Sequence, residues 1–398
     1  MWDHVDKNSV GKKGSIFALD WIGKRMNTPH IQKQAEEAFA EAEKIEPKIH
    51  AYRTTPQTLK WHAEGPVLAD HIHRILRAIF AVQGGASLLE IEEFAREKDL
   101  RDEIIEIEET LRAGSGTVIA FALLHDIAKR ETLSFNALES SKGASLGFTQ
   151  REGKNEPASE EDMMHYLKQI RLLQAAHPEL SGQEVTKKYY IDAEITVHNY
   201  HHDRIGASEA HLEARNKISD LYRLTPREQD LLVFIIRNHI RVLMDFKKEA
   251  SATKYNVLVE RATKEGFDAD DALDLLIVCL LLDSGFGSLQ YTDGTYRCDF
   301  TAVINMLRAE RAARPGRHKK REAAAELVKK QARKKVLKKA GLGSEEIYKL
   351  LGIKFGRERG EVKVAVMDLV ASRSSDYNFG EHTEEIHRRV KRAKALLT

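Results

Sequence analysis

The fold of this chain is decided by the stretch Val118-Ile-Ala-Phe-Ala-Leu-Leu-His-Asp-Ile-Ala-Lys129. Its first part, Val118 to Leu124, is apolar on every side of a helix, which predicts a helix buried on all faces. His125 and Asp126 follow directly. A buried carboxylate without a partner costs several kcal/mol, and aspartate is rarely buried unless it is paired. The pattern therefore indicates a core helix that ends at a functional group.

Apolar residues recur at helical spacing over much of the chain between about residues 66 and 290. The clearest stripes lie in residues 72–80, 232–243 and 273–280. Only eight prolines and 7% aromatic residues are present, which favours helix over strand. With 42% hydrophobic and 31% charged residues, the composition is that of a globular protein. We therefore expect an all-α fold, a compact helical bundle with a smaller C-terminal helical tail.

Three further polar residues interrupt the apolar stripes. His71 lies one turn before Ile75, His239 continues a stripe of isoleucines, and Asp283 follows three leucines. No Lys or Arg lies in these stripes to neutralise the aspartates. Imidazole nitrogens and carboxylate oxygens together suit a divalent transition metal such as Mn, Ni, Co, Fe or Zn. The alternative is a set of hydrogen-bonded core side chains without a metal.

The order of these residues resembles the HD superfamily of metal-dependent phosphohydrolases. The resemblance is carried by His71, by Leu123-Leu-His-Asp-Ile-Ala-Lys129 and by Asp283. Residues 201–207, His-His-Asp-Arg-Ile-Gly-Ala, are similar to the family segment His-Glu-x-x-Gly-Ala, which favours His202 over His201. His239 falls where many members have another histidine.

The resemblance implies a first metal bound by four residues and a second metal that Asp126 bridges. The expected ligands of the first metal are His71, His125, Asp126 and Asp283. His202 and His239 would complete the second site, or instead hold the phosphate.

A narrower resemblance links the chain to CCA-adding tRNA nucleotidyltransferases and bacterial poly(A) polymerases. Lys60-Trp-His-Ala-Glu-Gly-Pro-Val67 is similar to the start of their HD domain, and Tyr348-Lys-Leu-Leu-Gly-Ile-Lys-Phe-Gly-Arg-Glu-Arg-Gly360 to a turn in their tRNA-binding tail. Pro66, Ile72 and Phe355 depart from the family pattern. Residues 1–60 lack the Gly-Ser and Asp-x-Asp motifs of the nucleotidyltransferase head, so nucleotide addition is not expected.

Three regions are expected along the chain. Residues 1–60 form a helical extension, residues 61–305 form the HD phosphohydrolase domain, and residues 306–398 form a basic helical region. Within the middle region, the polar and glycine-containing segment 134–162 reads as a long loop. Loops of this length in a compact domain are often functional, and this one is a candidate lid.

The charge of the chain is unevenly distributed. Residues 308–339 carry 14 Lys and Arg against 3 Glu, although the net charge of the whole chain is +2. Such a basic segment favours contact with a polyanion, here RNA or tRNA, whose binding would weaken steeply with salt. The alternative is a solvated helix face.

These features predict a phosphatase or phosphodiesterase. Asp126 and Lys129 are the expected catalytic residues, and Lys129, Arg130, Arg204 and His62 are expected to bind substrate. The substrate class is a phosphate ester, with 2′,3′-cyclic phosphate or 2′-phosphate RNA ends as candidates. Alternatives are a nucleotide phosphohydrolase, a diiron oxygenase of the HD type and a non-catalytic RNA-binding protein.

The cellular setting follows from two simpler features. Two cysteines without metal-binding spacing fit a reducing, cytoplasmic environment. No apolar run is long enough for a membrane span, so no membrane contact is expected. Nothing in the pattern indicates the oligomeric state.

Overall fold

The computed structural model describes residues 25–57, 61–137, 157–180, 184–185, 195–292 and 295–313. Contacts divide the chain into two units, Met1–Ala312 and Ala313–Thr398. Most of the basic segment 308–339, the tail motif at 348–360 and most of the expected loop 134–162 lie outside the described residues. The expected role of these three segments stays a prediction.

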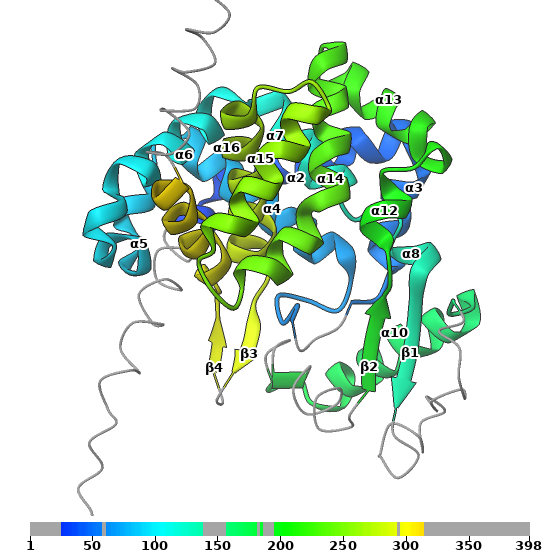
Figure 1. The fold of residues 1–398 in the computed structure, drawn as a ribbon. Helices are drawn as coiled ribbons and strands as arrows, with labels where there is room; N and C mark the ends of the chain where they lie inside the picture. The colour runs from blue at the N-terminus through cyan, green and yellow to red at the C-terminus, as the bar shows by residue number, and fades with distance from the viewer. Residues whose placement is uncertain are drawn as a thin grey trace, which may run out of the picture. The chain divides into compact units, whose positions relative to one another are not determined.

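The described residues are mostly helical, as predicted (Figure 1). No helix among them has both the length and the apolar character that crossing a membrane requires. The α-helices are α2 (Pro29–Ile45), α3 (Pro47–His50), α4 (Leu68–Gln83), α5 (Glu92–Arg96), α6 (Arg101–Ala113), α7 (Ser115–Leu124), α8 (Lys129–Thr132), α10 (Glu160–Ala176), α12 (His202–Gly206), α13 (Leu212–Leu221), α14 (Pro226–Phe246), α15 (Ala252–Lys264) and α16 (Ala269–Leu280). Short 3₁₀ turns are η3 (Ala51–Thr54), η4 (Leu88–Glu90), η5 (Lys98–Leu100) and η7 (Glu209–His211), and η8 (Leu281–Gly287) is a π-helix.

Local sequence sets where the long helices begin. Thr225 caps α14 by accepting a hydrogen bond from the Glu228 backbone N–H, while the Glu228 carboxylate accepts one from the Thr225 backbone N–H. Pro226 occupies the first helical position, where its missing N–H has no cost. Ser159 and Asp162 form the same reciprocal cap at α10. These caps satisfy backbone donors that helix starts leave unpaired.

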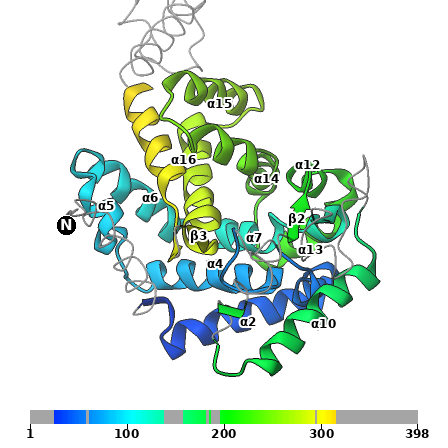
Figure 2. The same ribbon diagram turned by 90° about the horizontal axis from the view of Figure 1, so that it is seen from below.

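The apolar helix α7 lies at the centre of the bundle, where it contacts α4, α14 and α16 (Figure 1). Its residues from Val118 to Leu124 are buried. Figure 2 shows α2 running along α4, and the two helices are in contact. The fully apolar stretch of residues 118–124 is therefore the core around which the other helices pack.

The described residues also contain two small antiparallel sheets of two strands each, which the all-α expectation did not include. Strand β1 (Leu133–Ala137) pairs with β2 (Ile195–Asn199), and β3 (Gln290–Thr292) pairs with β4 (Thr295–Arg297). Leu133 and Phe135 alternate inward and pack with Ile195, Val197 and α10 in a small apolar cluster.

Strand β1 and helix α10 correct the two ends of the expected loop 134–162. Residues 134–137 belong to β1 instead of a loop, and Ser159 already caps α10. The reason is the apolar cluster that β1 joins, which a search for polar and glycine-rich composition does not detect. The proposed boundary near residue 305 also falls inside an ordered element, since residues 301–313 are helical and Val303, Met306 and Leu307 are buried.

Replacing Leu123 by Ala tests the central position of α7. Leu123 is fully buried, so the change should lower the free energy of unfolding by about 2–5 kcal/mol. Leu172→Ala on α10 is the matched control, because Leu172 is 53% exposed and its loss should change stability by about 0.5 kcal/mol or less. Urea unfolding followed by circular dichroism measures both. Equal effects would show that α7 is not a core helix.

Candidate metal centre

Five separate elements bring six buried His and Asp side chains together. His71 lies on α4, His125 and Asp126 directly follow α7, His202 opens α12, His239 lies on α14 and Asp283 lies in η8. All six are buried. The end of α7 also directs the negative pole of the helix dipole at this place, which favours a cation.

The first triad consists of His71, His125 and Asp283, whose ligand atoms lie within 4.8 Å of one another. His71 Nε2 is 3.2 Å from Asp283 Oδ1, and His125 Nε2 is 3.7 Å from the same oxygen. The residues are separated by up to 212 positions in sequence, and the fold brings them together.

The second triad consists of Asp126, His202 and His239, again within 4.8 Å. Asp126 connects the two triads through its two oxygens. Its Oδ2 lies 3.2 Å from His125 Nε2 and 3.9 Å from His71 Nε2, whereas its Oδ1 lies 3.2 Å from His202 Nε2. The carboxylate therefore has the geometry of a bridge between two neighbouring ion positions.

Hydrogen bonds at the far side of three rings fix which nitrogen faces the centre. The Nδ1 atoms of His125, His202 and His239 point at the backbone carbonyls of Phe121, Asn199 and Ile236, respectively. A carbonyl only accepts hydrogen bonds, so each Nδ1 carries the hydrogen and Nε2 of the neutral ring holds a lone pair.

The central atoms lack the hydrogen bonds that would make them ordinary core groups. The Nε2 atoms of His71, His125, His202 and His239 are buried and have no hydrogen-bond partner among the described residues. The Nε2 atoms of His125 and His202 each lie 3.2 Å from an oxygen of Asp126, which is also an acceptor. Lone pairs opposed in this way repel one another unless cations lie between them. These clusters can therefore hold metal ions, and their donor set suits a divalent transition metal.

Electrostatic surroundings keep the two aspartates of the centre ionised. Burial raises the pKa of Asp126, but the neighbouring His125 and Lys129 lower it well below its usual range. Burial likewise raises the pKa of Asp283, and His71 and His125 lower it. Burial lowers the pKa of His71, while Asp283 and Glu64 raise it, to a result of about 9. A metal ion binding to His71 would therefore displace a proton.

The π-helix η8 and a glycine bring Asp283 close to His71. Single turns of π-helix inside α-helical segments occur often at functional sites. Arg74, one turn after His71 on α4, is buried and donates from Nε to the backbone carbonyl of Phe286 in η8. A side chain on Gly287 would collide with the His71 ring, since a Cβ there would lie 2.6 Å from His71 Cε1. Close contact between α4 and η8 therefore requires glycine at this position.

A tight turn after β2 places His202, and not His201, at the centre. His201 has a positive φ of 61°, a left-handed conformation that few residues other than glycine adopt. It is exposed, whereas His202 is buried beside Asp126. The structure thus brings to the centre the histidine that the sequence favoured.

Lys129 corrects the expectation that no basic side chain neutralises the aspartates. It is buried, with Nζ 2.6 Å from Asp126 Oδ2. The two residues are three positions apart, in the turn that follows α7, so the lysine reaches back to the carboxylate. Lys129 therefore lies at the centre itself.

Arg130 and Arg204, the other two basic residues expected to bind substrate, lie in different surroundings from Lys129. Arg130 donates to the Thr54 carbonyl and pairs with Glu160, so it links α8 to η3 and α10. Its guanidinium is engaged in these structural contacts, which does not favour the expected phosphate contact. Arg204 is exposed on α12, two residues after His202. The His62 ring, in contrast, lies edge-on to the His71 ring with centroids 4.7 Å apart.

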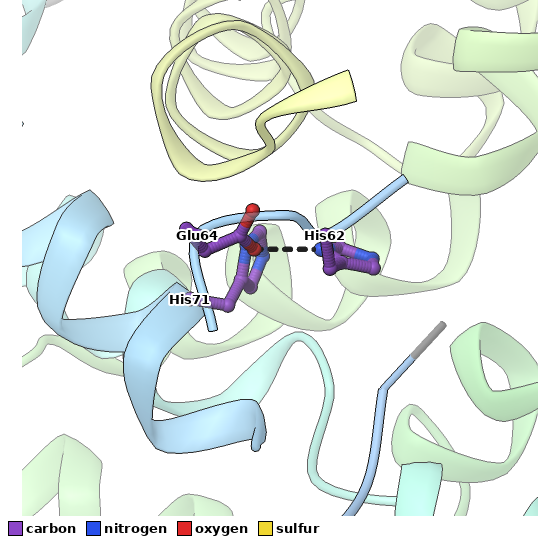
Figure 3. A group of neighbouring side chains, drawn as sticks. All are labelled: His62, Glu64 and His71. Carbon is purple, nitrogen blue, oxygen red and sulfur yellow. Dashed lines mark hydrogen bonds and ion pairs between the residues drawn. The ribbon is translucent and has the colours of Figure 1, made fainter. Parts of the chain in front are cut away.

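Glu64 belongs to the site, although the sequence pattern did not indicate it as a site residue. It is buried between His62 and His71, and Figure 3 shows its carboxylate facing both rings. Burial raises its pKa, but His62 and His71 lower it to about 2, so it stays ionised. The signal was present in the His-x-Glu spacing at residues 62–64, seven positions before His71, but a loop has no periodicity that would show which way a side chain points.

No protein-family model, curated protein or solved structure matches this chain. The HD resemblance accordingly rests on the motif residues alone and stays a prediction. What the geometry adds is independent of that resemblance: a buried group of four imidazoles and two carboxylates that can hold metal ions.

Gly287→Ala tests the close contact between η8 and His71. The added methyl group should displace the His71 ring and weaken metal binding to the first triad by about tenfold or more. Gly206→Ala is the control beside the second triad, because a Cβ there meets Ile127 Cγ2 at 3.4 Å, an ordinary contact. Calorimetric titration with Zn²⁺ measures both affinities, and melting of the metal-free proteins separates this effect from lost stability. Unchanged Zn²⁺ affinity in Gly287→Ala would contradict the assignment.

Proposed function

We propose that the chain is a metal-dependent phosphohydrolase of the HD type. The observation that carries the proposal is the pair of buried triads joined by the two oxygens of Asp126. Two ions bridged by one carboxylate are a common arrangement for stabilising the attacking and leaving oxygens of a phosphoryl group. The order of the six residues along the chain supports the same class.

The residues of the chain divide the work in this proposal. Bound metal would lower the pKa of a water molecule and shield the charge of the phosphoryl oxygens. Asp126 joins the two triads through its two oxygens. The backbone carbonyls bonded to the Nδ1 atoms of His125, His202 and His239 fix the direction of these rings. Lys129, at 2.6 Å from Asp126, is placed to contact a phosphate oxygen as a point charge. His62 lies beside the first triad and is the second candidate contact for substrate.

The proposed substrate is a phosphate ester, with RNA ends bearing a 2′,3′-cyclic phosphate or a 2′-phosphate as the first candidates. The support is the basic composition of residues 308–339 together with the resemblance to CCA-adding enzymes. A free nucleotide is the alternative within the same reaction class. Turnover of RNA ends compared with 2′,3′-cyclic mononucleotides distinguishes the two.

Metal analysis of the purified protein, paired with a phosphatase screen that includes RNA ends, tests the proposal. We expect up to two transition-metal ions per chain and metal-dependent phosphate release. Asp126→Ala should bind neither ion tightly and lose activity by about 100-fold or more, since it removes the bridge. Asp245→Ala, an ion-paired residue at the far end of α14, is the control and should behave like the wild type.

Two other outcomes would replace the proposal. Stoichiometric iron with oxygen-dependent turnover would identify a diiron oxygenase, because the same donor set suits iron. A metal-free protein that binds RNA without turnover would identify a non-catalytic RNA-binding protein.

Lys129→Met separates metal binding from substrate binding. Methionine keeps much of the side-chain length but removes a positive charge 2.6 Å from Asp126 Oδ2. Loss of that repulsion should strengthen metal binding, while kcat/KM for phosphate esters should fall by about tenfold or more. Lys48→Met is the control, since Lys48 pairs with Glu131 on the surface. Weaker metal binding in Lys129→Met would show that the lysine is a structural support and not a substrate contact.

A further inference from the structure

The carboxylate of Glu64 accepts three hydrogen bonds. Its Oε1 lies 2.9 Å from His62 Nδ1 and 3.2 Å from His71 Nδ1, and its Oε2 accepts from the backbone N–H of Leu289 at 2.8 Å (Figure 3). The side chain is only 4% exposed. Both carboxylate oxygens thus accept hydrogen bonds from the protein, and the side chain is nearly inaccessible to water.

His71 differs from the other three histidines of the centre in what holds its ring. His125, His202 and His239 are held by backbone carbonyls, whereas His71 is held by the charged side chain of Glu64. Because a carboxylate only accepts, His71 Nδ1 carries the hydrogen and Nε2 is directed at Asp283. A charged partner also makes the imidazole a more basic ligand than a carbonyl does.

The three residues His62, Glu64 and His71 also have the spacing of a possible third metal site. Two observations favour hydrogen bonds instead. Both Nδ1 atoms meet hydrogen-bond geometry with Glu64 Oε1, unlike the Nε2 atoms at the centre. A metal on His71 Nδ1 would also have to share this ring with the ion of the first triad.

Glu64 also connects the ligand helix to the segment after Asp283. Leu289 lies two residues after the end of η8, and the backbone N–H of Ala63, next to Glu64, donates to the Leu289 carbonyl at 2.8 Å. These hydrogen bonds therefore hold the loop of residues 61–67 against the segment that follows η8. One carboxylate thus acts on both the ring of His71 and the backbone that follows Asp283.

We propose that Glu64 is a positioning residue, which fixes the tautomer and direction of His71 and the approach of η8, and so selectively sets the affinity of the first triad for metal. This inference rests on the proposed metal centre. The same carboxylate holds His62 beside the first triad.

Glu64→Gln is the test, because it keeps the size of the side chain. Its amide keeps one acceptor oxygen and puts an NH2 donor in place of the other, so it cannot accept both from the two histidines and from Leu289, and it carries no charge. We expect metal affinity of the first triad to fall about 10–100-fold while that of the second triad is unchanged. Titrations of Asp283→Ala and His239→Ala with Zn²⁺ assign the two binding steps. Equal Zn²⁺ affinity in Glu64→Gln and the wild type would overturn the proposal.

Glu108→Gln is the matched control for lost folding. Glu108 is also buried, accepts from the backbone N–H of Leu88, and lies on α6 outside the metal centre. We expect the two metal-free variants to melt at similar temperatures, with only Glu64→Gln weakened in Zn²⁺ binding. Equal weakening in both variants would show a general loss of packing and would overturn the proposal.

Nitrogen NMR of the ¹⁵N-histidine wild type with Zn²⁺ gives a test that needs no variant at Glu64. His71 should have Nε2 on the metal and a hydrogen on Nδ1, and His71→Gln assigns the signal. A metal on Nδ1 would overturn the proposal in favour of the third site. Wild type that binds no Zn²⁺ would instead refute the metal centre, so the two failures are distinguishable.

Discussion

The centre of this protein depends on one buried carboxylate that faces acceptors on both sides. Asp126 lies between the imidazoles of His125 and His202, and neither contact has the geometry of a hydrogen bond. Groups that repel one another are tolerated in an apolar core only when positive charge lies among them. Lys129 provides one such charge, and the remaining lone pairs fit metal ions. The packing of α4, α7, α12, α14 and η8 against one another holds these groups in place.

The helices and the centre could be predicted from sequence for the same physical reason. Apolar residues at helical spacing must face a core, so polar residues within those stripes must face the core as well. His71, His239 and Asp283 are of this kind, and the structure brings them together. Because burial of an unpaired charge is costly, a few such residues on separate helices restrict the fold more than many surface residues do.

The sequence pattern could not predict the features that depend on tertiary contacts. Glu64 lies in a loop, where no period shows which way a side chain points. The pairing of Lys129 with Asp126 depends on the turn after α7, and β1 depends on apolar partners in β2 and α10 that are distant in sequence. The π-helix η8 packs against α4, which is more than 190 positions earlier in sequence. In each case the feature depends on a residue that is distant in sequence, or on a loop or turn that has no helical or strand periodicity.

The burial of all six centre residues has a kinetic consequence. Asp283, the most exposed of them, is only 7% exposed. A metal ion held among these side chains would be shielded from solvent, and its release would be assisted by transient local openings of the packed helices. Such an ion would therefore leave more slowly than one bound at an exposed site.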